Sequence, residues 1–150
     1  MALGGAVTSP ADLCEKLERV FPPEEFRGLV AAHDCEQCDA IRRTFSHRRW
    51  TDILDAELDA HDDVLALLTP EAYCTFLPTW IRRGLREPER GVATLALINM
   101  EATEHVDSFT ALQRTVLLEC VQYIHQSDPF RVQDDESIRE IESIRRRWAS

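Results

Sequence analysis

The feature that most constrains this chain is the spacing of its apolar residues, which recur three and four positions apart along almost the whole length. This spacing places apolar side chains on one face of an α-helix, whereas a half-buried strand alternates at every second residue. No clear alternation of the strand type competes with it. The sequence therefore predicts an all-α fold, a compact single-domain bundle of about six to eight helices.

Capping residues and prolines predict where these helices begin. A hydroxyl before a proline, or an Asp, Ser or Thr three residues before a Gln or Glu, is typical of a helix start. Pro78 lies inside the strongest helical segment, and we expect a kink there because proline lacks the amide hydrogen and clashes with the preceding turn. The predicted starts are Ser9-Pro10, Pro23, Asp34, Thr51, Thr69-Pro70, Gly91, Thr110 and the pair Asp134-Asp135.

Each predicted helix carries one apolar stripe that we expect to face the core. His61 falls on such a stripe, which favours a hydrogen-bonded core histidine. The stripes consist of Leu13, Leu17 and Val20; Phe26, Leu29 and Val30; Cys35, Cys38, Ile41 and Phe45; Leu54, Leu58, His61, Leu65 and Leu68; Tyr73, Phe76, Leu77, Trp80 and Ile81; Leu112, Val116, Cys120 and Ile124; and Ile138, Ile141 and Ile144.

The length of 150 residues suits one domain that buries a core without metals or disulfides. We assign residues 1–150 to a single helical domain and expect residues 1–8 to be a disordered tail. No stretch approaches the roughly 20 apolar residues of a membrane helix, and the N-terminus lacks the pattern of a signal peptide. The five cysteines are an odd number, which fits reduced thiols. We therefore expect a soluble cytoplasmic protein that has no contact with membranes.

The formal net charge of −10 argues against general nucleic-acid binding and suits a basic protein partner. Acidic residues gather in the segment 52–63, and four of them recur at three- and four-residue steps that share one helix face. This face can be a solvated surface, a contact for a basic protein or a Mg²⁺ site of the kind found in helical pyrophosphohydrolases. The candidate partner-binding residues are Asp52, Asp55, Asp59, Asp62 and Asp63.

A basic cluster of Arg42, Arg43, His47, Arg48 and Arg49 precedes the acidic segment, with Trp50 beside it. Arginine next to an aromatic ring can stack on nucleic-acid bases. Because the acidic segment follows at once, we expect the two segments to pair within the molecule instead.

The candidate metal ligands are His33, Cys35 and Cys38. Two thiols and an imidazole at this spacing match the ligand types of zinc, although a fourth ligand must come from elsewhere. The competing interpretation is that both cysteines pack in the core. A redox role is a further alternative, since two cysteines at a helix N-terminus can be reactive, but no βαβ pattern surrounds them.

Two segments, HDCEQCDAIRRTF (residues 33–45) and LLTPEAYCTFLPTWI (residues 67–81), resemble a bacterial domain family without an assigned mechanism. In that family an H-D-C-x-x-C segment is followed by an L-T-P-E-A-F/Y…L-P segment. The resemblance implies a single bacterial domain and no particular activity. It also draws attention to His33, Cys35 and Cys38.

No catalytic motif is present: the sequence has no glycine-rich phosphate loop, no G-x-S-x-G and no H-E-x-x-H. The first functional hypothesis is a small acidic binding module, an immunity or inhibitor protein that neutralises a basic partner. The alternative is a zinc-stabilised helical domain with a structural or regulatory role. An enzyme that uses the aspartates or a thiol ranks third. Zinc, in the alternative hypothesis, is the one cofactor that the sequence suggests.

Overall fold

The computed structural model describes residues 9–61, 65–88, 100, 105–127 and 135–149. Within these ranges the all-α class is confirmed, with six α-helices and three 3-10 helices. The α-helices are α1 (Pro10–Val20), α2 (Glu36–Phe45), α3 (Asp55–Asp59), α4 (Pro70–Arg86), α6 (Ala111–Ser127) and α7 (Asp135–Ala149), and the 3-10 helices are η1 (Trp50–Asp52), η2 (Leu65–Leu67) and η3 (Val106–Ser108). None of these helices is both long and apolar enough to cross a membrane.

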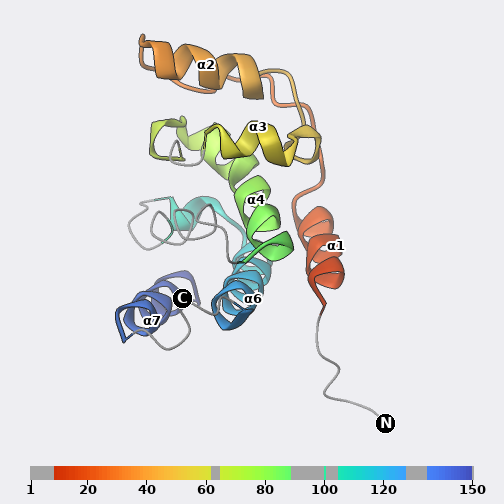
Figure 1. The fold of residues 1–150 in the computed structure, drawn as a ribbon, viewed down its shortest axis with the longest axis vertical. Helices are drawn as coiled ribbons and strands as arrows, with labels where there is room; N and C mark the ends of the chain where they lie inside the picture. The colour runs from red at the N-terminus through yellow and green to blue at the C-terminus, as the bar shows by residue number, and fades with distance from the viewer. Residues whose placement is uncertain (1–8, 62–64, 89–99, 101–104, 128–134, 150) are drawn as a thin grey trace.

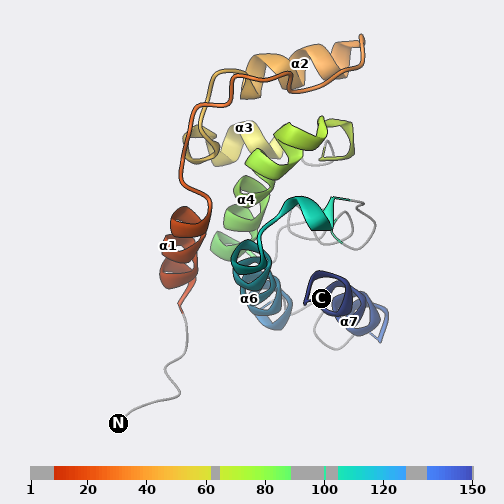
Figure 2. The ribbon, with the colours of Figure 1, turned by 180° about the vertical axis from the view of Figure 1, so that it is seen from behind.

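Helix α4 occupies the centre of the molecule. It packs against α1, α3, α6 and η1, while α6 also packs against α1 and α7. Figure 1 shows α2 at one end, α3 between α2 and α4, and α6 with α7 at the other end, and Figure 2 shows the same order from behind. The helix continues through Pro78, and its ribbon bends part-way along, as expected (Figure 1).

The predicted capping residues lie where the sequence placed them at three helix starts. The hydroxyls of Ser9, Thr69 and Thr110 each accept a hydrogen bond from the amide three residues ahead, at 3.1, 3.2 and 3.1 Å. Each bond satisfies one of the amide groups that the first turn of a helix leaves without a partner. These caps fix the beginnings of α1, α4 and α6.

The helix predicted to begin at Pro23 does not form, and residues 22–30 run as irregular chain. The Phe26 amide instead donates to the Arg48 carbonyl, and the Phe26 carbonyl accepts from the His47 amide, both at 3.0 Å. The Phe26 ring packs edge-on against Phe76, with 5.5 Å between centroids. These long-range contacts hold Phe26 in irregular chain, so Leu29, three residues later, does not share a helix face with it. Leu29 is 59% exposed and does not face the core.

The segment predicted to begin a helix at Thr51 forms shorter pieces. Thr51 lies inside η1, and α3 begins only at Asp55, with Leu54 as its N-cap residue. Leu54 is 65% exposed, so its place on the predicted apolar stripe was wrong, whereas Leu58 is buried. His61 is hydrogen-bonded as expected, with 2.9 Å between its Nε2 and the Thr44 hydroxyl, but it is half-buried and does not belong to the core.

Buried residues from all six helices form one core cluster. Between α2 and α4, Phe45 stacks on Trp80 with ring centroids 5.6 Å apart. At α7, the ring centroids of Trp148 and Phe109 lie 5.2 Å apart, and Trp148 Nε1 donates to the Met100 carbonyl at 2.9 Å. The tail predicted for residues 1–8 lies outside the described residues, as does the helix predicted for residues 91–100 except for Met100, which is helical and buried.

Candidate functional site

The two cysteines of the predicted metal cluster lie at the N-terminus of α2 and differ in exposure. Cys35, and not the predicted Asp34, is the N-cap residue, and its Sγ accepts a hydrogen bond from the Cys38 amide at 3.3 Å. Cys38 is 0% exposed, whereas Cys35 is exposed. The interpretation that both thiols face the core is therefore wrong for Cys35, because the chain enters the helix there and the side chain lies off its buried stripe.

The surroundings of the two thiols change their pKa values in opposite directions. Hydrogen bonds from the amide and the thiol of Cys38 lower the pKa of Cys35, and the Gln37 amide adds to this effect. The pKa of Cys38 is raised, first by its hydrogen bond to Cys35 and then by desolvation. A thiolate at a helix N-terminus is stabilised by the amide groups that point at it. Cys35 is therefore the thiol of this pair that ionises first.

The third candidate ligand, His33, lies in the exposed chain before α2. Its backbone carbonyl accepts a hydrogen bond from Arg42 at 2.9 Å. Within the ranges given above, no group of three or more His, Cys, Asp or Glu side chains is assembled as a metal site. A zinc site formed by His33, Cys35 and Cys38 stays a prediction, for which this part of the chain shows no complete ligand set.

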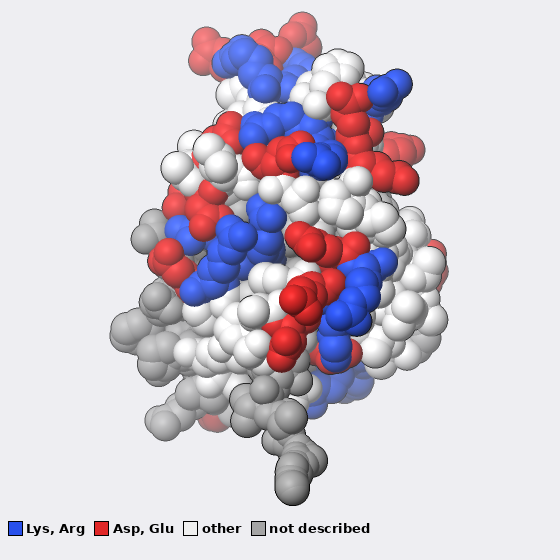
Figure 3. All heavy atoms as spheres, turned by 90° about the vertical axis from the view of Figure 1, so that its right-hand side faces the viewer, with Lys and Arg blue, Asp and Glu red and all other residues white. Residues whose placement is uncertain are grey.

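The acidic segment is bonded to arginines of the same molecule. Asp52 pairs with Arg49 at 3.0 Å, and Asp55 pairs with Arg86 at 3.1 Å. Asp59 pairs with Arg83 at 2.9 Å. The other two candidate partner-binding residues, Asp62 and Asp63, lie outside the described residues. On the face seen in Figure 3, acidic and basic side chains alternate in adjacent patches.

Arg83 explains why the carboxylates of α3 point toward α4. Its side chain is almost fully buried, with 5% exposed. The guanidinium donates to Asp59 at 2.9 and 3.1 Å, to Asp55 at 3.3 Å and to Glu87 at 3.0 Å. A buried charge without such partners would be strongly destabilising. The hydrogen bonds to these carboxylates raise the pKa of Arg83. Because Asp55 and Asp59 belong to α3 and Arg83 belongs to α4, these bonds hold the two helices together.

The predicted pairing between the basic cluster and the acidic segment is confirmed. The Arg48 guanidinium binds both carboxylate oxygens of Glu57, at 2.7 and 2.8 Å. It also donates to the backbone carbonyls of Thr44 and Asp52, at 3.0 and 2.6 Å. Arg48 therefore joins the end of α2, η1 and α3.

A groove that the sequence analysis did not predict lies between residues 21–28, the first turns of α4 and the start of α6. Its volume is about 510 Å³. Three exposed glutamates, Glu24, Glu25 and Glu71, line it, together with a single arginine, Arg27. The other lining residues are Phe21, Pro22, Phe26, Gly28, Trp50, Cys74, Thr75, Ser108, Phe109 and Gln113.

The electrostatic balance of this groove is acidic. Glu25 forms an ion pair with Arg27 at 2.7 Å, which leaves the charges of Glu24 and Glu71 in excess among the lining residues. The signal in the sequence was the run of two prolines and two glutamates at positions 22–25. That run is typical of a helix start, and no local pattern connects it with Glu71.

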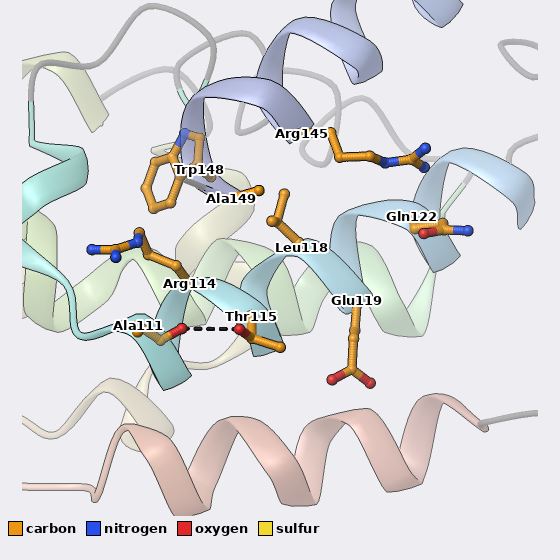
Figure 4. A pocket seen from close by; sticks show the side chains of 9 residues that line it. All are labelled: Ala111, Arg114, Thr115, Leu118, Glu119, Gln122, Arg145, Trp148 and Ala149. Carbon is orange, nitrogen blue, oxygen red and sulfur yellow. Dashed lines mark hydrogen bonds between the residues drawn. The ribbon is translucent and has the colours of Figure 1, made fainter.

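A second hollow, of about 310 Å³, lies between α6 and α7 (Figure 4). Several of its polar groups are bonded within the protein. The Thr115 hydroxyl donates to the Ala111 carbonyl at 3.0 Å, and Glu119 pairs with Lys16 at 2.8 Å. Arg114 donates to the carbonyl of Phe109 at 2.7 Å. Three of its polar side chains are therefore already engaged within the protein.

Comparisons with curated proteins and with solved structures found no match. One family model matches residues 30–150, and it describes a family of unknown function, DUF6714. The matched span begins after α1 and includes α2 with its two cysteines, the acidic segment and Glu71. Because the match covers most of its length, the chain belongs to the family of unknown function DUF6714.

Proposed function

We propose that this protein is a small acidic binding module of the immunity or inhibitor type, which neutralises a basic protein partner. The observation that carries the proposal is the groove lined by Glu24, Glu25 and Glu71 on a chain of net charge −10. Complementary charge accelerates the encounter with a basic surface and sets its orientation.

The chemistry of the groove suits arginine or lysine side chains of a partner. The carboxylates can bind a guanidinium or ammonium group, and Arg matches a carboxylate with two parallel hydrogen bonds. The exposed Pro22 in the lining offers apolar surface to the aliphatic part of such a side chain, whereas the aromatic lining residues are buried. We therefore assign to the partner a basic segment that inserts at least one arginine or lysine.

The groove replaces the acidic segment as the proposed contact. Asp52, Asp55 and Asp59 already hold arginines of their own chain. A partner would have to break these ion pairs, and breaking the pairs of Arg83 would leave a buried charge uncompensated. Among the residues that the structure describes, Glu24 and Glu71 hold no ion pair that a partner would have to break.

The test measures binding of a short, fluorescently labelled polyarginine peptide by anisotropy at low salt. The Glu24→Gln/Glu71→Gln variant removes two charges from the groove. Its control, Glu18→Gln/Glu142→Gln, removes two exposed charges from α1 and α7. We expect the groove variant to weaken binding roughly two- to thirty-fold, since each exposed ion pair contributes about 0.2–1 kcal/mol. The control variant should bind nearly as well as the original protein.

Equal weakening by the two double variants would contradict the proposal, because binding would then follow net charge alone. A polylysine peptide of the same length separates arginine recognition from general attraction. A polyglutamate peptide must not bind to either protein.

A further inference from the structure

The exposed position of Cys35 is not explained by its role as a helix cap. Asn, Asp and Ser are the preferred N-cap residues, and a sulfur atom accepts hydrogen bonds only weakly. Asp34 is available one residue earlier, yet the helix is capped by the thiol. Nor does Cys35 contribute to the core, since it is exposed, while Cys38, three residues later, is fully buried.

The two cysteines adjoin each other in the first turn of α2. The Cys38 amide donates to the Cys35 sulfur at 3.3 Å. All five cysteines are described and have free thiols, and Cys35 is the one that is exposed. An outside reagent therefore reaches Cys35 first, and the thiol nearest to the resulting adduct is Cys38.

We propose that Cys35 and Cys38 form a thiol–disulfide exchange couple that reacts with a disulfide substrate, with Cys35 as the attacking thiol and Cys38 as the resolving thiol. This site shares no residue with the glutamate-lined groove, and the proposal does not depend on the binding function.

The exchange takes place in two steps. The Cys35 thiolate attacks one sulfur of the substrate disulfide, a bond forms between these two sulfurs, and the other half of the substrate leaves as a thiolate that takes up a proton. Cys38 then loses its proton and attacks the Cys35 sulfur. The mixed disulfide breaks, and the second half of the substrate leaves as a thiol. The substrate gains two electrons and two protons, and the protein gains the Cys35–Cys38 disulfide.

The test equilibrates the whole protein with mixtures of oxidised and reduced glutathione, traps free thiols with an alkylating reagent and digests the chain with trypsin. Cleavage after Arg27 and Arg42 releases both cysteines in one peptide, residues 28–42, which contains no other cysteine. We expect this peptide to lose two hydrogen atoms and to escape alkylation under oxidising mixtures. This measurement needs no substitution, so it is independent of any effect on folding.

Two variants test the separate roles. In Cys38→Ser the first step proceeds and the second cannot, so glutathione should remain attached to Cys35. In Cys35→Ser the buried Cys38 should react at least about tenfold more slowly than Cys35 does in the original protein. Cys14→Ser is the control and should leave the oxidation of the peptide unchanged. Circular dichroism confirms that each variant is folded.

A peptide that carries two alkyl groups at every glutathione ratio would overturn the proposal. So would a Cys38→Ser protein that accumulates no glutathione at Cys35. Insulin, as a protein disulfide, is tested in a parallel reaction. Faster exchange with insulin identifies a protein substrate, and faster exchange with glutathione identifies a small one.

Discussion

At the scale of single residues, Arg83 determines what the carboxylates of α3 can do. Its guanidinium is buried, while the carboxylates around it keep 28–42% of their side-chain surface exposed. Removing the carboxylates leaves a charge in a site with little water, whereas removing the arginine leaves charges that water can still solvate. The two kinds of substitution should therefore have unequal costs.

We predict that Asp55→Asn/Asp59→Asn lowers the free energy of unfolding by about 2–4 kcal/mol. Arg83→Met should lower it by no more than about 2 kcal/mol, because an apolar side chain of similar length can fill the site. Urea denaturation followed by circular dichroism measures both. If Arg83→Met proved the more destabilising change, Arg83 would be contributing mainly through its packing, and this account of the acidic segment would be wrong.

At the scale of secondary-structure elements, Arg48 joins pieces of chain that are too short to be stable alone. Helix α3 has five residues and η1 has three. Helices of this length are not stable in isolation, so tertiary contacts must hold them. The Arg48–Glu57 pair provides such a contact, and hydrogen bonds from the arginine side chain lower the pKa of Glu57 below its usual value.

This lowered pKa predicts a specific acid dependence. A carboxyl group with a lower pKa in the folded state stabilises the protein above its unfolded pKa, and that contribution disappears as the pH falls through the folded value. The stability advantage of the original protein over Glu57→Gln should therefore be full at about pH 5.5 and clearly smaller at about pH 3. Urea denaturation at both pH values provides the measurement.

The control for this experiment is Glu142→Gln, which changes an exposed carboxyl group on α7. Its difference from the original protein should remain nearly constant between the two pH values. If Glu57→Gln behaved in the same way, the pair with Arg48 would not stabilise the folded state.

At the scale of the whole molecule, three fully buried tryptophans mark the connected core. Trp50 is the first residue of η1, Trp80 lies in the central helix and Trp148 lies near the end of α7. Trp148 joins α7 to the core, since it contacts Phe109 and donates to the Met100 carbonyl. The last turn of the chain is therefore part of the structure that stabilises the whole.

We predict that Trp148→Ala lowers the free energy of unfolding by about 3–5 kcal/mol, because it creates a large cavity. Trp148→Phe keeps an aromatic ring but leaves the Met100 carbonyl without its donor, and the predicted cost is about 1–3 kcal/mol. Urea denaturation followed by circular dichroism distinguishes the two values. A cost below about 1 kcal/mol for Trp148→Ala would mean that the core is stable without α7.

The fold class and several helix starts could be predicted because they depend on neighbours in the sequence. A cap at Thr69 needs only an amide three residues ahead, and an amphipathic stripe needs only its own period. The stripes were less reliable at their ends. Leu54, Leu112 and Ile138 were expected in the core and are 65%, 63% and 38% exposed. Period alone does not show how far a neighbouring element extends over a helix.

The candidate sites depended on contacts that the sequence does not specify. The acidic residues at 52–59 were visible as a pattern, but only the folded chain brings Arg83 and Arg86 against them. The glutamate-lined groove forms because Phe26 pairs with the 47–48 turn instead of continuing a helix. The sequence by itself determined where helices can begin and which faces are apolar, since these depend on short-range geometry. Tertiary structure alone decided which charges are neutralised, because the residues that pair lie far apart in the chain.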